Sequence, residues 1–362
     1  MKSKVALILM CTGLAFMLTA GFMRPPPTVQ RYTATDHDGV PPPAVATTVL
    51  LAGFRCLAAD LLWLRAAGLQ DQGRYMELVQ LAQWITALEP HFTPAWAVHA
   101  WNMAYNISLM MENDTDRWRW VKNGIKLLRD RGIPLNSDDP FLYTELAFIF
   151  FDKIGNPGNP ESQYLLRSWA HEMMDVVGEN GYPDYDKIER DTNTLARLKE
   201  YRLNPVVMRK IDRIYGPLDW RVPQTHALYW AYRGNTATGT NIHNAVCDRM
   251  IYQSMAAIFD HGKLTYSRKA DLFVRSGNFD VLPKALYAFE DAIEHSDSSL
   301  PREAYANFMK SAVLTLKFYH QNQKSRKLFE KLQTGYPSDI KCSFEDFTRN
   351  PGCTLPKILP PL

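Results

Sequence analysis

Residues 62–96, LWLRAAGLQDQGRYMELVQLAQWITALEPHFTPAW, predict the architecture of the chain. Apolar residues recur at helical spacing on both sides of a turn at residues 73–75, and Pro90 ends the second run. The pattern predicts two helices joined as a hairpin. Because a two-helix hairpin cannot bury its apolar face alone, we expect it to pack on neighbouring hairpins.

The spacing within this segment resembles the tetratricopeptide (TPR) repeat. Gly73 and Pro90 lie 17 residues apart, and Leu62 and Trp96 lie 34 residues apart. The second spacing equals the TPR period of about 34 residues. Trp96 therefore opens the second unit at the place where a TPR unit usually has a Trp.

The likeness is uneven along the chain. Residues 62–151 follow the TPR pattern closely, and residues 305–337 follow it weakly. Tyr143 corresponds to Trp96 in a third unit but comes 47 residues after it, so the array is irregular. The resemblance implies an all-α fold, an irregular TPR-like superhelix (α-solenoid), in which the first helices of successive units line a concave groove.

The chain is also similar to an uncharacterised group of bacterial membrane-anchored TPR-like proteins. The similarity rests on four stretches: GRYMELVQLAQWITALEP (73–90), HAWNMAYNIS (99–108), DRWRWVKNGIKLLRD (116–130) and YGPLDWRVPQTHALYW (215–230). It implies an architecture and a location in the bacterial envelope, and it implies no mechanism.

Residues 1–23 have the pattern of a signal anchor or a signal peptide. Lys2 and Lys4 precede an uncharged apolar run at residues 5–23. A helix of that length spans roughly 28 Å, close to the ~30 Å hydrocarbon core of a bilayer. A cut after Ala20 would place the bulky Leu18 at the minus-three position, which favours an uncleaved single-pass helix in the inner membrane. The bulk of the chain is then extracytoplasmic (periplasmic), and it is exported if the leader is cleaved.

The rest of the chain divides into five segments by composition and periodicity. We expect a Pro-rich stalk at 24–43, TPR-like repeats at 44–154, a helical insertion or degenerate repeat at 155–223, C-terminal helical repeats at 224–337 and a tail at 338–362. Within the third of these segments, Trp220 is expected to fill a gap between neighbouring helices. Residues 263–280 form a short irregular stretch that leaves room for a β-hairpin.

Composition indicates a folded protein and argues against nucleic acid as a partner. The 362 residues are 46% hydrophobic and 12% aromatic, and 41 basic side chains against 38 acidic ones give a formal net charge of +3. No Lys/Arg cluster provides the basic surface that nucleic acids require.

The cysteines suggest one disulfide. Cys56 and Cys247 lie in apolar helical segments and are expected in the core. Cys342 and Cys353 enclose ten residues with little apolar periodicity. Paired, they would suit an extracytoplasmic location; the alternative is two reduced thiols in a loose tail.

Motifs for catalysis, metal binding or cofactor binding are absent from the sequence. His171 and Glu172 begin HEMMD, but Asp175 stands where an HExxH zinc helix has its second His. No G-x-S-x-G motif and no phosphate-binding Gly loop occurs. Scattered histidines such as His99, His226 and His243 are expected to be hydrogen-bonded core or surface groups. We therefore predict no catalytic residue, no metal and no cofactor.

The strongest functional prediction is a surface that binds proteins or peptides. The TPR resemblance places Trp63, Trp101 and Tyr105 toward the concave face, and we add Glu145 of the third unit to this groove. The alternative is that these aromatic residues only pack adjacent helices.

Two asparagines share this helix face. Asn102 and Asn106 lie four residues apart, so their amides can hydrogen-bond an extended peptide backbone. The lysine and asparagine pattern of TPR domains that clamp a terminal carboxylate is missing.

The predicted function is a membrane-anchored scaffold that binds partner proteins of an envelope assembly, secretion or transport system. A rival prediction is a glycan-binding protein or enzyme of the envelope in which carboxylates such as Glu145 and Asp152 act, and it requires a pair of acids about 5 to 9 Å apart. A third is a purely structural subunit whose apolar surface is permanently covered.

Overall fold

The computed structural model describes residues 43–237, 244–337 and 339–350. The predicted anchor (1–23), the stalk up to residue 42 and His243 lie outside the described residues. The chain divides between Phe54 and Arg55 into two units. Of the first unit, the structure describes only the start of one helix. Every contact discussed below lies within the second unit.

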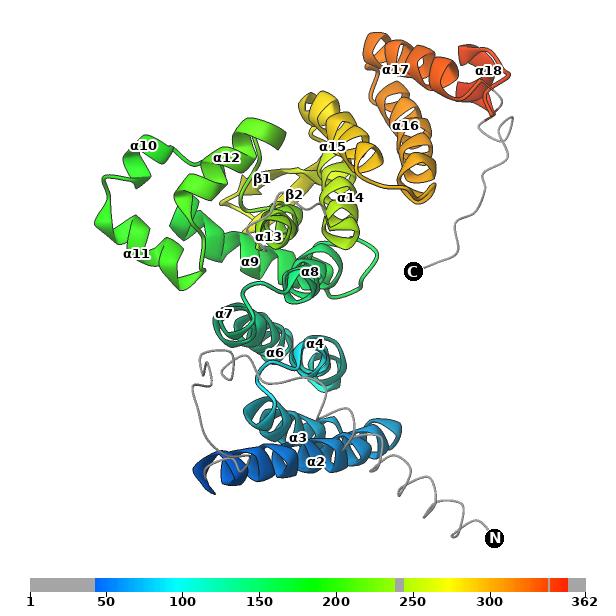
Figure 1. The fold of residues 1–362 in the computed structure, drawn as a ribbon. Coiled ribbons are helices and arrows are strands. Elements are labelled where there is room, and N and C mark those ends of the chain that lie inside the picture. The colour runs from blue at the N-terminus through cyan, green and yellow to red at the C-terminus, as the bar shows by residue number, and fades with distance from the viewer. Residues whose placement is uncertain (1–42, 238–243, 338, 351–362) are drawn as a thin grey trace. The chain divides into compact units, whose positions relative to one another are not determined.

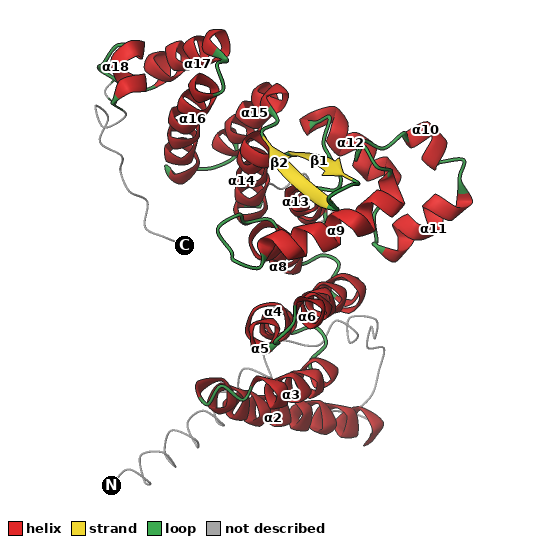
Figure 2. Cartoon of the chain, turned by 180° about the vertical axis from the view of Figure 1, so that it is seen from behind, coloured by secondary structure: helices red, strands yellow, loops and turns green. Residues whose placement is uncertain are grey.

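The described chain is mostly helical, which confirms the predicted all-α class (Figure 1, Figure 2). In chain order the elements are α2 (Pro43–Asp71), α3 (Tyr75–Leu88), α4 (Thr93–Trp101), η2 (Asn102–Ile107), α5 (Ser108–Met110), α6 (Asp114–Leu127), η3 (Leu128–Gly132), α7 (Ile133–Leu135), α8 (Pro140–Phe148), η4 (Ile149–Ile154), α9 (Ser162–Val177), α10 (Tyr185–Ile188), α11 (Thr192–Glu200), α12 (Pro205–Tyr215), α13 (Pro223–Thr236), α14 (Ala245–His261), β1 (Lys263–Ser267), β2 (Leu272–Ser276), η5 (Phe279–Val281), α15 (Leu282–Glu294), α16 (Leu300–Phe318), α17 (Asn322–Gly335) and α18 (Phe344–Arg349).

Side-chain caps explain where individual helices begin. Asp139 accepts a hydrogen bond from the backbone N–H of Phe141 at 2.9 Å at the start of α8. Asn204 accepts one from Val206 at 2.9 Å at the start of α12. In both helices the first residue is a proline, which suits this position because the first helical N–H has no partner within the helix.

Three helices change to π-helical hydrogen bonding within their length. The π-helical segment η2 continues α4, η3 continues α6, and η4 continues α8. A π-helical turn distorts the regular ladder and occurs frequently at functional sites. These segments therefore guide the search for a site.

Consecutive helices pack on one another through the second unit. α3 contacts α4, η2 contacts α6, and α8 contacts α13. From there each helix contacts the next one: α13 contacts α14, α14 contacts α15, α15 contacts α16, and α16 contacts α17. The C-terminal part of α2 packs on α3 through Ala66, Leu69, Leu78 and Ile85. These apolar helix faces are thus covered by neighbouring helices, whereas Leu61 and Leu64 of α2 and Trp84 of α3 remain exposed.

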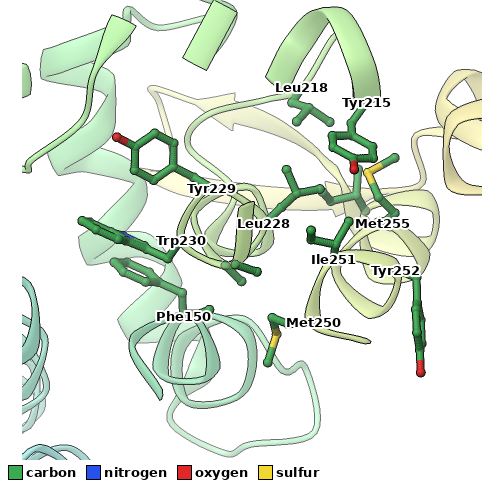
Figure 3. Close-up of a cluster of buried hydrophobic side chains, with 14 of the residues drawn as sticks. Phe150, Tyr215, Leu218, Leu228, Tyr229, Trp230, Met250, Ile251, Tyr252 and Met255 are labelled. Carbon is green, nitrogen blue, oxygen red and sulfur yellow. The ribbon is translucent and has the colours of Figure 1, made fainter. Parts of the chain in front are cut away.

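Helix α13 lies at the centre of the core. It contacts α8, η4, α9 and α14, and most of its side chains are buried. Figure 3 shows Leu228 of α13 among side chains from other elements, including Tyr215 of α12 and Ile251 and Met255 of α14. Because neighbouring elements enclose most of the helix, both apolar and polar side chains of α13 are buried.

The segment that leads into α13 is also buried. Trp220 is fully buried, and its Nε1 donates a hydrogen bond to Asp212 Oδ2 at 3.0 Å. Tyr185 donates to the same carboxylate oxygen. Burial raises the pKa of Asp212, while these hydrogen bonds act in the opposite direction. Asp212 thereby joins α10, α12 and residues 216–222.

A small antiparallel hairpin, β1 and β2, follows α14. Its register pairs Leu264 with Arg275 and Tyr266 with Phe273. Leu264 and Phe273 are buried in a cluster with Leu166 of α9. A β-hairpin is therefore present within residues 263–280, and its apolar face covers α9.

No helix within the described ranges combines the length and the apolar character that a membrane span requires.

Candidate functional site

Three aromatic rings from two helices form a layer that we call the aromatic surface: Trp101, Tyr105 and Phe148. The Trp101 and Tyr105 rings stack with centroids 4.2 Å apart and planes inclined by 18°. Phe148 lies parallel to Trp101 within 10°, at 6.4 Å, and 6.5 Å from Tyr105. Trp101 remains 41% exposed. The layer thus leaves a large part of the Trp101 side chain exposed to solvent although the helices beneath it are packed.

Polar groups below the layer hold Tyr105 in place. Its hydroxyl donates to Asp152 Oδ2 at 3.1 Å, and Lys153 Nζ lies 5.4 Å from its ring centroid. Lys153 is buried and pairs with Glu161 at 2.6 Å. Burial, and then the neighbouring Asp152 carboxylate, raise the pKa of the Tyr105 hydroxyl. Tyr105 is therefore a fixed neutral donor.

Glu145 lies one helical turn from the aromatic surface, on α8. It is half-buried, and its burial raises the pKa of its carboxyl group. Its charge also acts on the Tyr105 hydroxyl. Within the described residues the structure gives the Glu145 carboxylate no hydrogen-bond donor and no ion pair. It is accordingly a candidate to receive a cationic group from a ligand.

The two asparagines on η2 bind each other. Asn106 Nδ2 donates to Asn102 Oδ1 at 2.6 Å, which agrees with their predicted common face. Asn102 is only 2% exposed, and its Nδ2 has no partner among the described residues. In this conformation Asn102 supports the surface from below, and Asn106, which is half-buried, is the one that a partner can reach.

Trp63 lies in a different cluster. It is half-buried and packs with the α2–α3 core, and its ring meets Phe92 edge-on at 5.9 Å. No ring contact links it to Trp101 within the described residues. The prediction that Trp63 and Trp101 share one groove is therefore not supported by their ring contacts, since Trp101 lies with Tyr105 and Phe148.

Phe148 and the supporting Lys153 were not predicted as part of this site. Phe148 lies 47 residues from Trp101, and its ring reaches the layer because α8 contacts α4. The sequence carries one signal that can find this site: aromatic residues cluster in both helices, at residues 101–105 and 141–151. Lys153 follows no recognisable motif.

The HEMMD segment is occupied by structural contacts. Glu172 accepts hydrogen bonds from Trp118 Nε1 at 3.1 Å, from Lys122 at 2.8 Å and from Tyr201 at 3.0 Å. His171 Nε2 lies 2.8 Å from Asp271. Among the described residues no group of three or more His, Cys, Asp or Glu side chains is arranged to hold a metal ion.

Only one of the two cysteines of the predicted disulfide lies within the described residues. Cys342 is disulfide-bonded, and Cys353, its expected partner, lies outside the described residues. Cys247 is a free, fully buried thiol whose pKa burial raises to about 12, which suits its expected place in the core.

Comparison of the chain with protein-family models, with curated proteins and with solved structures gives no match.

Proposed function

We propose that the protein is a membrane-tethered, extracytoplasmic scaffold of TPR-like helical hairpins that holds a partner protein on the aromatic surface. The observation that carries this proposal is the Trp101 indole, 41% exposed yet stacked on Tyr105 and aligned with Phe148. Tryptophan and tyrosine supply a disproportionate share of the binding free energy at protein interfaces.

The fixed geometry of the aromatic surface favours binding. Tyr105 is held by Asp152 and by the cation of Lys153, so little side-chain entropy remains to be lost when a partner docks. The π-helical segments η2 and η4 carry Tyr105, Asp152 and Lys153. π-helical turns occur frequently at functional sites, and both helices that support the aromatic surface contain one.

The charge beside the surface indicates the chemistry of the partner. Glu145 is half-buried and has no cationic neighbour that satisfies it among the described residues. A lysine or arginine of the partner can supply that cation and lay its methylene groups on the Trp101 face. We therefore expect the partner to present a basic side chain next to an apolar or aromatic one.

Two sequence features support the location. The apolar run at residues 5–23 has the length of a membrane span, and disulfides such as that of Cys342 persist mainly in oxidising compartments. A tether restricts the aromatic surface to the vicinity of the membrane and so raises the effective concentration of a bound partner for other envelope components. We propose partners from an envelope assembly, secretion or transport system.

The rival function, a glycan-binding protein or acid-dependent enzyme, has weaker support. Trp101 could stack on a sugar ring, but Asp152 uses one carboxylate oxygen for Tyr105 and the other for Asn156, at 3.1 Å each. A carboxylate that accepts two such hydrogen bonds is placed for a structural role. Of the two carboxylates named for the rival function, Glu145 would then have to act alone, although that function requires a pair of acids.

The test is affinity capture of the tagged full-length protein from gently solubilised native membranes. Wild type, Trp101→Ala and Glu145→Lys are compared with Trp84→Ala, a matched control that removes a 60% exposed tryptophan on α3. We expect the same proteins to co-purify with wild type and the control and to be lost from the other two variants. Equal capture by all four proteins would refute the assignment to this surface. Retention of soluble glycans in place of proteins, abolished by Trp101→Ala, would favour the rival.

A further inference from the structure

A second candidate site lies between α6, η3, α9 and the end of α11. A cavity of about 500 Å³ is lined there by residues of these elements, among them Arg129 of η3 and Trp169 of α9, and by Tyr201 and Arg202, which follow α11. A neighbouring cavity of about 580 Å³ shares Arg129, Lys199 and Arg202 with it and extends to Arg233 of α13. We call the two together the cationic pocket.

The cationic pocket carries a concentrated positive charge. Six basic residues line it, namely Lys122, Lys126, Arg129, Lys199, Arg202 and Arg233, against three acidic residues, Asp130, Glu172 and Glu200. The excess of three positive charges is as large as the formal net charge of the whole chain. Clustering of this kind in a concave site favours anionic ligands.

Two of the three acids are already used by the protein. Glu172 accepts bonds from Trp118, Lys122 and Tyr201. Asp130 accepts two bonds from Arg129 at 2.8 Å each, while Arg202 lies farther away, at 3.6 Å. Neither carboxylate can therefore neutralise the remaining cations.

Three of the cations have no acidic partner within the described residues: Lys126, Lys199 and Arg233. The first two are exposed at the rim, and Arg233 is half-buried with only tyrosine hydroxyls beside it, Tyr229 at 3.3 Å and Tyr143. Unpaired cations around one cavity repel one another, and a bound anion would relieve this repulsion.

Buried donors lie in the wall of the same pocket. Arg129 is only 6% exposed and lies over the Tyr201 ring at 5.7 Å. Its Nε and Nη2 donate to Asp130 at 2.8 Å each. Trp169 is 2% exposed, and its buried Nε1 has no hydrogen-bond partner among the described residues. An unsatisfied buried donor is costly and is rare unless a ligand or water completes it.

The backbone at Arg202 adds a separate indication. Arg202 follows the end of α11 with a positive φ of 55°, and Leu203 N closes the turn on Leu198 O at 2.9 Å. Glycine usually occupies this position of a helix end. Non-glycine residues in this conformation are strained, and such residues cluster at functional sites. Arg202 lines both cavities.

We propose that the cationic pocket binds a small molecule with a phosphomonoester group. A dianionic phosphate fits an excess of three positive charges better than a single carboxylate does, and its oxygens can accept hydrogen bonds from Lys199 and Arg202 at the cavity. The Tyr201 ring offers apolar surface to the organic part of the ligand. The phosphate belongs either to a soluble metabolite or to a lipid headgroup, and this assignment is independent of the partner-binding surface.

The test is calorimetric titration of the full-length protein in detergent with inorganic phosphate and, separately, with soluble short-chain phosphatidic acid. Short-chain phosphatidylcholine, which lacks the monoester, is the ligand control. The variants are Lys199→Gln and Arg202→Gln, with Arg197→Gln as a matched control, since Arg197 lies on α11 but does not line the cavity. Lys199, Arg202 and Arg197 are all exposed, so the variants should fold.

We expect saturable binding that weakens about tenfold or more in each pocket variant and is unchanged in the control, because each substitution removes a charged hydrogen-bond donor. Binding of inorganic phosphate indicates a soluble ligand, and binding of phosphatidic acid alone indicates a lipid headgroup. Absence of binding by both probes, or equal weakening by Arg197→Gln, would overturn the proposal.

Discussion

Arg221 and Asp219 form an ion pair that is almost completely enclosed by the protein. Arg221 donates from Nε at 2.9 Å and from Nη2 at 2.7 Å, and only 3% and 1% of the two side chains are exposed. Arg221 also donates to the carbonyl groups of Glu179 and Leu264. The pair therefore joins the loop after α9, the segment before α13 and strand β1.

Removal of one member of this pair should destabilise the protein severely. In Arg221→Met the Asp219 carboxylate stays buried without its counter-ion, which costs about 3–5 kcal/mol. Urea unfolding followed by circular dichroism measures the loss. The double variant Asp219→Asn, Arg221→Met should recover part of it, since no unpaired charge is then buried. A loss below about 1 kcal/mol, typical of exposed pairs, would contradict this account.

Two glycines with similar backbone conformations should respond differently to alanine. Gly181 has φ of 76°, and a Cβ atom there would lie 2.0 Å from Asp219 Oδ1. Gly73 has φ of 68° but nothing within 4 Å of such an atom. Gly73→Ala should cost about 1–2 kcal/mol of unfolding free energy from backbone strain alone. Gly181→Ala should cost clearly more, because the Asp219–Arg221 pair has to move. Equal losses in thermal unfolding would show that the pair tolerates displacement.

Two buried histidines should make stability fall on mild acidification. Burial lowers the pKa of His99 and of His226 to about 4, whereas an unfolded chain titrates near 6.5. Between these values the unfolded state binds more protons than the folded state, so the stability present above pH ~6.5 is lost as the pH falls toward ~4. Each histidine contributes about 3 kcal/mol to this loss.

The variant His99→Met tests the pH dependence directly. The two ring nitrogens of His99 have no hydrogen-bond partner among the described residues, so the substitution removes the titrating group without leaving a donor unsatisfied. Its unfolding free energy should depend less steeply on pH than that of the wild type. Identical slopes would mean that His99 is not the group that titrates.

The sequence predicted helices best where strong end signals bound them. Helix α3 begins at Tyr75 and ends at Leu88, between the predicted turn at Gly73 and the stop at Pro90. Helix α15 falls within residues 224–337, which were predicted as helical repeats, but its own bounds were not predicted. No side-chain cap marks its start, and three of its five buried residues are small alanines, Ala285, Ala288 and Ala292.

The candidate sites could be predicted only in part, because each depends on contacts between distant segments. Trp101 and Tyr105 share a helix, so local spacing sufficed to pair them. Asn102 was expected at the surface because it shares a face with Asn106, but helix α4 is apolar on most sides and its continuation is buried there. The cationic pocket combines residues that lie between positions 122 and 233 of the chain. No local sequence pattern predicts that these residues meet.

The most direct test of the central proposal is photo-crosslinking in living cells from position 101. A benzophenone amino acid replaces Trp101 and keeps an aromatic ring there, and the same amino acid at Trp84, which is 60% exposed, serves as the control. The scaffold proposal predicts discrete adducts with one or a few envelope proteins from position 101 and none of these from position 84. If the adducts form from position 84 instead, or if position 101 gives none while the protein is folded, the aromatic surface is not where the partner binds.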